Sequence, residues 1–127
     1  MIIQKKIYYH HTDCGGVVYY AHYLNFIEEA RTEYFASKGA SIKELATVGV
    51  MFVVARQEID YKAPAVYGDC LDVKTQIGEV SGVRIEFLHE IHNQNQQLIV
   101  KARTILVCVG SNFKPQAIPE DLRKKIT

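Results

Sequence analysis

One segment of this chain carries helical periodicity over a length that can cover a sheet. Between residues 21 and 38, apolar side chains recur at intervals of three and four, which places them on one face of a helix. The stripe consists of Tyr23, Phe26, Ile27, Ala30 and Tyr34. Because a helix must bury its apolar face against another element, and strands supply the only other large apolar surface, the sequence predicts an α+β fold. We expect one antiparallel sheet wrapped around a single long helix.

Most of the remaining sequence alternates between apolar and polar residues as strands do. The five expected strands cover residues 1–9, 51–62, 70–80, 83–92 and 98–109. Two short helices are also expected, one that begins with a capping box at Ser41 and ends near Gly49, and one that begins at Pro119. We expect residues 1–127 to form a single domain, a curved five-stranded sheet around one central helix. One helix covers only part of such a sheet, so homo-oligomerisation is expected to bury the rest.

The charge balance and the cysteine pattern exclude several classes of protein. The chain has 127 residues, with 15 basic and 14 acidic side chains and a net charge of +1. No basic block is present, so nucleic acid is not an expected partner. No apolar run reaches the ~20 residues that span a membrane, and the three cysteines contain no paired C-x-x-C spacing. These features predict a cytoplasmic protein with free thiols and no transmembrane segment. Peripheral association with the inner membrane is left open.

The first candidate for chemistry is Asp13, in a polar loop before the long helix. It opens a flexible, apolar run whose two glycines let the backbone approach a ligand closely. A lone aspartate at such a place is usually a cap or turn residue. Asp13 lies too far upstream to cap a helix that begins near residue 21, so we predict that it is a catalytic acid or base. Gly16 and Val17 are predicted to line the substrate site.

The start of the helix is a candidate site for an oxyanion. Tyr20 is expected in the first turn, where backbone N–H groups lack helical partners and the helix dipole is positive. Its N–H can polarise a carbonyl oxygen and stabilise the charge that develops during acyl transfer. Its ring can pack at the helix entry at the same time, because the catalytic group belongs to the main chain.

Neighbouring side chains offer alternatives that spacing alone does not decide. His22 can act as a base in the same region, although a surface or structural role is the simpler interpretation. Cys14 can act as a thiolate only beside a positioned histidine, and a small buried residue is the simpler interpretation. Side chains at adjacent positions, or three apart on a strand, are expected to diverge, so no metal site is predicted. These pairs are His10 with His11 and His89 with His92.

Segment 8–23 reads YYHHTDCGGVVYYAHY and is followed by EEARTE at residues 28–33. This segment resembles the signature of the hotdog-fold acyl-CoA thioesterases. The similarity is greatest to the YbgC-like (Tol-Pal-associated) branch of the 4-hydroxybenzoyl-CoA thioesterase family. Shorter matches at residues 52–54, 61–65 and 107–119 extend the resemblance over nearly the whole chain. It implies a curved antiparallel sheet around a long helix, in agreement with the architecture predicted above.

The resemblance implies roles for individual residues. Asp13 matches the family's catalytic aspartate, and Tyr20 matches the helix-start residue whose N–H polarises the thioester carbonyl. The strand that matches Phe52, Val53 and Val54 partly lines the acyl pocket, and the family's sites form at a dimer interface. The implied reaction is hydrolysis of an acyl-CoA to free acid and CoA. Asp13 acts as nucleophile or general base, and no metal or redox cofactor is required.

A candidate contact for CoA lies elsewhere in the sequence. Arg84, beside the Ser81-Gly82 turn, can bind a phosphate, although a solvated arginine on a strand is the simpler interpretation. One departure from the family concerns charge. The branch usually carries an acid just before the motif threonine, where His10 and His11 stand in this chain. This replacement is expected to change the charge around the catalytic aspartate.

Two other functions compete with thioester hydrolysis. A dehydratase or hydratase of the same fold typically carries a His-x-Pro-Gly run, which this sequence lacks. A non-catalytic partner of acyl carrier protein or of an envelope complex would keep the fold for binding alone. The acyl group, the carrier thiol (CoA or acyl carrier protein) and the choice between homodimer and homotetramer are left open.

Overall fold

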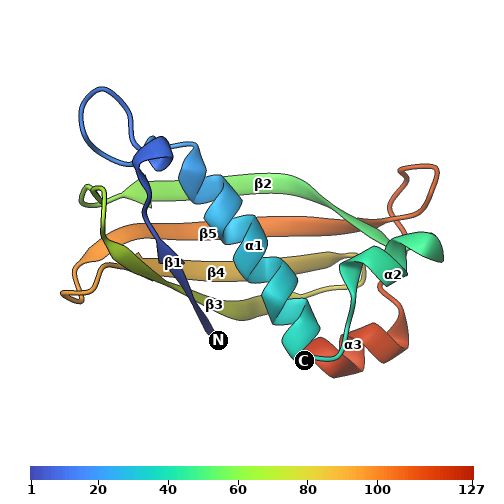
Figure 1. Cartoon of the computed structure of the whole chain (residues 1–127). Coiled ribbons are helices and arrows are strands. Elements are labelled where there is room, and N and C mark those ends of the chain that lie inside the picture. Colours follow the sequence, from blue (N-terminus) through green and yellow to red (C-terminus); the bar gives the residue numbers. More distant parts are fainter.

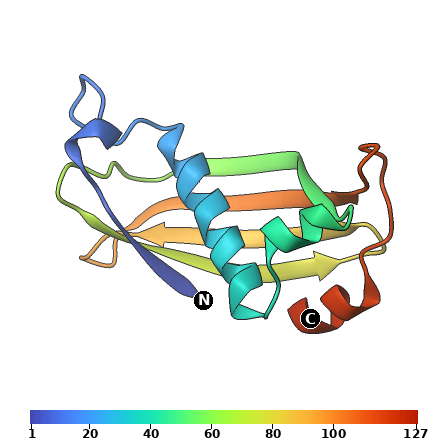
Figure 2. The same cartoon turned by 45° about the vertical axis from the view of Figure 1, so that its right-hand side comes forward.

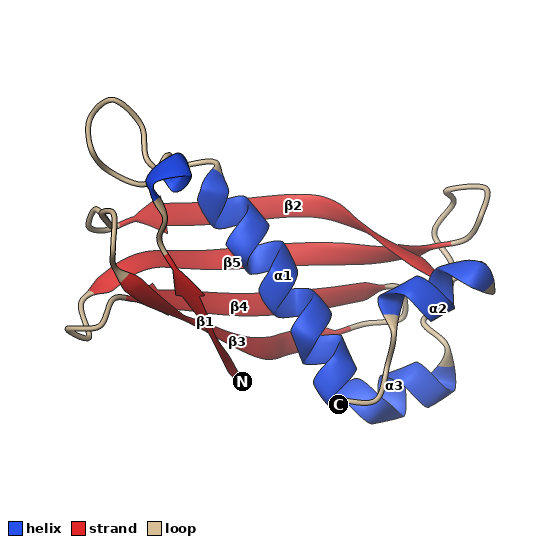
Figure 3. Ribbon diagram, in the orientation of Figure 1, coloured by secondary structure: helices blue, strands red, loops and turns tan.

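The computed structural model describes all 127 residues and contains one sheet and one long helix (Figure 1). The strands are β1 (Ile2–Lys6), β2 (Met51–Tyr61), β3 (Cys70–Val80), β4 (Arg84–His92) and β5 (Leu98–Val109). The helices are α1 (His22–Ser37), α2 (Ile42–Thr47) and α3 (Glu120–Ile126), with one 3-10 turn, η1 (Tyr9–His11). In Figure 3, α1 crosses one face of the sheet, and α2 and α3 lie near its C-terminal end. No helix is long and apolar enough to cross a membrane.

All neighbouring strands are antiparallel, in the spatial order β1-β3-β4-β5-β2. A register shift in β2 falls between Val54 and Arg56. Such bulges increase local twist and bend the strand that carries them, and Figure 2 shows the sheet curving past α1. Strand β2 lies at the edge of the sheet and pairs only with β5. Its other edge therefore presents unpaired backbone groups over the whole length of the strand.

The predicted apolar stripe of the long helix is confirmed. Its five side chains are each 7% exposed or less. The first half of α1 packs into one core cluster around Ile27, and the second half into another around Phe35 and Phe87. The helix extends over His22–Ser37, one residue shorter at each end than predicted. The expected α+β architecture, one antiparallel sheet around a central helix, is what the structure shows.

The predicted and observed strand bounds agree best for β3 and β5, where they are identical, and least near the N-terminus. Strand β1 ends at Lys6 because the chain then turns into η1, so residues 7–9 are not strand as expected. The expected divergence of His10 and His11 is also wrong. Their ring centroids lie only 4.1 Å apart, since successive residues of a 3-10 turn do not alternate between two faces.

Candidate active site

A short hairpin holds Asp13 at one end of the molecule, between η1 and α1 (Figure 1). Thr12 pairs with Val18 at its base. The Asp13 N–H donates to the Val17 carbonyl at 3.0 Å, and the Gly16 N–H donates to the Asp13 carbonyl at 3.0 Å. Gly16 has a φ of +81°, a conformation that favours glycine. This glycine therefore fixes the turn that presents the aspartate.

The Asp13 carboxylate is exposed to solvent. Its Oδ1 accepts a hydrogen bond from the Gly15 N–H at 2.8 Å, and a Cβ atom at Gly15 would lie 3.1 Å from that oxygen. Its Oδ2 has no hydrogen-bond partner in the chain. One carboxylate oxygen is thus held by the backbone, and the other is available to a water molecule or a substrate.

Tyr20 lies two residues before the first residue of α1, and Ala21 takes the N-cap position. The prediction that Tyr20 belongs to the first turn is therefore wrong by about half a turn. The Tyr20 N–H donates to no acceptor in the chain. The Tyr19 N–H donates to the His11 carbonyl and the His22 N–H to the Tyr19 carbonyl, both at 2.9 Å, whereas the Ala21 N–H, like that of Tyr20, has no acceptor in the chain. The Tyr20 N–H remains free to bind an oxyanion.

Tyrosine side chains surround the region between the Asp13 carboxylate and the Tyr20 N–H. The rings of Tyr19 and Tyr20 lie 4.9 Å apart, and the Tyr61 hydroxyl donates to the Tyr20 carbonyl at 3.4 Å. The pKa of Tyr19 is raised chiefly by the neighbouring Tyr20 hydroxyl, and the Asp13 carboxylate raises it further. The charge of Asp13 therefore raises the pKa of Tyr19, the residue that precedes the Tyr20 N–H.

His11 is a structural element of the site that sequence reasoning missed. Its ring is buried, and its Nδ1 accepts the Tyr8 N–H at 2.9 Å while its carbonyl accepts the Tyr19 N–H. It thus ties the end of β1 to the entry of α1 and closes the base of the hairpin. Burial lowers the pKa of His11, and His10 and His22 lower it further. No sequence signal marks this role, because the fold brings the bonded groups together.

The alternative nucleophile and base lie in the same region. Cys14 is exposed, so its expected burial is wrong; it occupies a hairpin that projects from the core. His22 is half-buried, with its ring 5.3 Å from that of His11. No group of three His, Cys, Asp or Glu side chains is arranged to hold a metal ion.

Two of the three predicted acyl-lining residues face a cavity. Phe52 and Val54 line a cavity of about 110 Å³ between α1 and β2, together with Phe35 and Leu106. The rings of Phe35 and Phe52 stack with centroids 5.5 Å apart. Val53 belongs to the opposite face of the strand, since alternate side chains point to opposite sides. We name this space the α1–β2 cavity.

The α1–β2 cavity and the Asp13 hairpin lie at opposite ends of β2. Tyr61, which contacts Tyr20, ends the strand, whereas Phe52 stands near its start. At ~3.3 Å per residue these positions are roughly 30 Å apart. Within one chain, the structure therefore does not bring the predicted acyl-lining residues to the predicted catalytic residues.

The predicted CoA contacts lie at the β3–β4 turn, also far from Asp13. Arg84 is exposed. The guanidinium of Arg123, on α3, donates to the carbonyls of Ser81 and Gly82 at 2.5 and 3.2 Å. These bonds give the turn a structural role, and its contact with CoA stays a prediction.

A buried cation lines the α1–β2 cavity. Arg31 is 9% exposed, and its only hydrogen bond is to Thr104 Oγ1 at 3.5 Å. The Thr104 hydroxyl donates to Gln57 Oε1 at 2.7 Å. Burial lowers the pKa of the Arg31 guanidinium, and Glu28 raises it. Glu28 forms no ion pair with Arg31; its exposed carboxylate accepts the hydroxyl of Thr32 at 3.3 Å.

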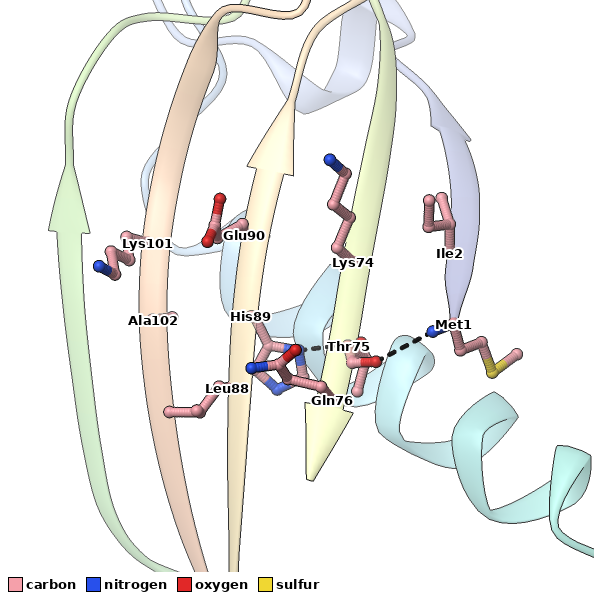
Figure 4. A pocket seen from close by; sticks show the side chains of 10 residues that line it. All are labelled: Met1, Ile2, Lys74, Thr75, Gln76, Leu88, His89, Glu90, Lys101 and Ala102. Carbon is pink, nitrogen blue, oxygen red and sulfur yellow. Dashed lines mark hydrogen bonds between the residues drawn. The ribbon is translucent and has the colours of Figure 1, made fainter. Parts of the chain in front are cut away.

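A hollow of about 470 Å³ contains none of the predicted site residues (Figure 4). Its charged lining residues, Lys74, Glu90 and Lys101, alternate along their strands with side chains buried beneath α1. They therefore belong to the outer face of the sheet. On these strands His89 is bonded to Thr75 at 3.0 Å (Figure 4), and burial lowers the pKa of His89 to about 3.

An antiparallel sheet curved around one long helix is the hotdog architecture. Residues 9–126 match the thioesterase-like superfamily, and the chain belongs to that family. The resemblance seen in the sequence is thereby confirmed, as are the fold and the enzyme class.

Individual relatives support this assignment. The chain is 37% identical to the acyl-CoA thioester hydrolase YbgC of Escherichia coli over 118 residues, which cover 92% of this chain and 88% of the relative. It is 38% identical to the acyl-CoA thioesterase YbgC of Haemophilus influenzae over 120 residues, covering 93% and 88%. The crystal structure of a 1,4-dihydroxy-2-naphthoyl-CoA thioesterase from Synechocystis superposes with a TM-score of 0.91 at 28% identity, covering 98% of this chain and 93% of that one.

Proposed function

We propose that this protein hydrolyses acyl-CoA thioesters at the Asp13 hairpin. The observation that carries the proposal is the pairing of a carboxylate that has one free oxygen with an unbonded N–H at the entry of α1. The Tyr20 N–H would donate a hydrogen bond to the carbonyl oxygen of the thioester and stabilise the negative charge of the tetrahedral intermediate. The family membership and the two YbgC relatives support this reaction.

Asp13 can act in either of two ways. As a general base, it takes a proton from water, and the resulting hydroxide attacks the carbonyl carbon. As a nucleophile, its carboxylate oxygen attacks that carbon, the thiolate leaves, and water then hydrolyses the mixed anhydride. Both routes release a free acid and a thiol, and both use the same oxyanion donor. Neither requires a metal or a redox cofactor.

A homodimer through the free edge of β2 would complete the site. If two copies pair antiparallel about the middle of that strand, near Arg56, the Phe52 end of one strand lies beside the Tyr61 end of the other. The α1–β2 cavity of one copy would then adjoin the Tyr20 N–H of the second. This arrangement would cover an exposed strand edge and unite the acyl-lining residues with the catalytic residues. A tetramer would be a further pairing of such dimers.

Thiol release from a panel of short, long and aromatic acyl-CoAs tests the proposal, with wild type and Asp13→Asn compared side by side. We expect turnover by the wild type and a loss of about 10²–10⁴-fold in kcat in the variant, with unchanged thermal stability. Turnover like that of the wild type in Asp13→Asn would contradict the assigned role.

Two further measurements refine the proposal. Acyl carrier protein thioesters in the same assay separate the two possible carrier thiols. They also separate an enzyme from a non-catalytic partner, which would bind the carrier without releasing thiol. A single turnover in ¹⁸O water separates the two routes. The general-base route places the heavy oxygen in the acid product, whereas an anhydride opened at the Asp13 carbonyl leaves it on the protein.

A further inference from the structure

The α1–β2 cavity holds a charged group without adequate partners. Arg31 reaches into it from α1, and the guanidinium has five N–H donors. Only one of them has an acceptor in the chain, the Thr104 hydroxyl at the long distance of 3.5 Å. No carboxylate lies within 4.0 Å of it, and it is more than nine-tenths buried. Buried charges in folded proteins are normally paired and hydrogen-bonded. The chain supplies no ion-pair partner for Arg31, so the acceptor must come from another molecule.

Most of the remaining cavity lining is apolar. It is formed by Phe35, Ile42, Phe52, Val54 and Leu106. Its volume of about 110 Å³ is somewhat smaller than a cavity of about 150 Å³ that binds one benzene molecule. A space of this size and lining suits the outer few carbons of an acyl group with a single polar end.

The charges around the cavity restrict where that polar end can lie. Glu28 and Thr32 line the same space, but the Glu28 carboxylate is exposed and accepts the Thr32 hydroxyl. Gln57 is occupied by Thr104 and by backbone carbonyls. Among these groups, Arg31 alone offers several free donors to the interior of the cavity.

We propose that the acyl group hydrolysed by this protein carries a hydrogen-bond-accepting oxygen, a hydroxyl or a carboxylate, that binds Arg31 at the far end of the α1–β2 cavity. The inference rests on the proposed function, because the β2-paired dimer places this cavity beside the Tyr20 N–H of the other copy. Arg31 then selects the substrate and takes no part in the chemical step. A methyl-terminated acyl group would leave the guanidinium without its acceptor.

The test compares acyl-CoAs of four to eight carbons that end in a methyl, a hydroxyl or a carboxylate group. We expect kcat/KM for an oxygenated substrate to exceed that of its methyl-terminated match at least tenfold at one chain length. The hydroxyl and carboxylate arms distinguish the two forms of the acceptor. In Arg31→Met the preference should vanish, whereas Arg31→Lys, which keeps the charge, should retain part of it.

A second pair of variants keeps the test decisive if Arg31→Met does not fold. Val54→Glu adds a carboxylate to the cavity wall that competes for the guanidinium, and Val54→Gln adds a side chain of the same size without the charge. We expect Val54→Glu to lower the ratio of oxygenated to methyl-terminated kcat/KM well below that of Val54→Gln. Equal ratios in these two variants would contradict the inference.

Other results also separate the inference from the proposed function. Hydrolysis of methyl-terminated acyl-CoAs with no oxygenated preference at any length overturns the inference and leaves the proposed function standing. No hydrolysis of any acyl-CoA overturns both. If Arg31→Met keeps the substrate preference but weakens self-association in sedimentation, the acceptor for Arg31 belongs to a second copy of the chain, and the inference is wrong.

Discussion

The two ends of α1 are built in different ways. At its N-terminal end the Asp13 hairpin is held by backbone hydrogen bonds and by the ring of His11, and most of its side chains are exposed. At its C-terminal end Phe35 packs between Phe52 and Phe87 in a dense core. The first end is shaped by main-chain geometry and the second by apolar burial. Substitutions in the hairpin should therefore affect activity more than stability, whereas those in the packed core should affect stability most.

The largest effect on stability is expected at the C-terminal end of α1, which we call the packed end. Phe35 is 1% exposed, and truncation of such a side chain leaves a cavity, so Phe35→Ala should lower the free energy of unfolding by about 3–5 kcal/mol. The matched change at the other end is Tyr67→Ala, since Tyr67 is 62% exposed. This variant should stay within about 0.5 kcal/mol of the wild type. Urea unfolding measures both values, and similar losses would show that the two ends do not differ as described.

The sequence predicts the packed end better than the hairpin, for a physical reason. Burial imposes a period on side chains, so the stripe on α1 and the alternation in β3 are legible in the sequence. The hairpin is instead fixed by contacts between distant backbone groups, such as the Tyr19 N–H with the His11 carbonyl. The sequence therefore indicates that Asp13 and the Tyr20 N–H belong to one region, but it does not reveal the role of His11.

The separation of the predicted site residues has a similar origin. The resemblance groups Phe52 and Val54 with Asp13, and no local pattern gives the direction of β2 relative to the hairpin. That direction follows from the pairing of β2 with β5, which places Phe52 at the far end of the strand. The sequence also does not indicate the bulge between Val54 and Arg56, because both residues are compatible with a regular strand.

A change in pH should act most strongly through His89 in the middle of the molecule, because the pKa of His89 is lowered to about 3; the buried His11 at the hairpin end also has a lowered pKa. The folded pKa of His89 is about 3, below the ordinary value of 6.5, because the ring is buried and Arg31 is near. Between these pH values the unfolded chain binds a proton that the folded chain does not. The stabilisation is therefore complete above pH 6.5 and is lost as the pH falls, by at most about 1.4 kcal/mol per pH unit.

His89→Gln isolates this contribution, because glutamine does not titrate and can still hydrogen-bond Thr75. Urea unfolding of the wild type and the variant from pH 7 to pH 4.5 measures the difference between their slopes. We expect the wild type to lose stability more steeply than the variant below pH 6.5. Parallel curves would show that His89 does not keep a lowered pKa in the folded protein.

Substitution of one glycine near each end of α1 tests the two ends with the same backbone strain. Gly16 has a φ of +81° and Gly39, at the end of α1, has a φ of +78°, and an added Cβ would meet no atom within 4 Å at either position. Alanine at either site should cost about 1–2 kcal/mol of stability. Only Gly16→Ala should also lower kcat/KM, by at least tenfold, because it displaces the hairpin that presents Asp13. An equal effect of both variants on activity would show that the hairpin is not part of the active site.

The smallest effect is expected at Cys14, beside the aspartate that we propose is catalytic. A thiolate mechanism needs a base within hydrogen-bond reach of the sulfur. The nearest histidine along the chain, His11, is buried and uses Nδ1 to accept the Tyr8 N–H. The Cys14 side chain is exposed and makes no hydrogen bond in the chain. Cys14→Ala should therefore keep kcat within about twofold of the wild type. If this variant folds normally but releases no thiol, the nucleophile is Cys14, and Asp13 is left with a supporting role in the same hairpin.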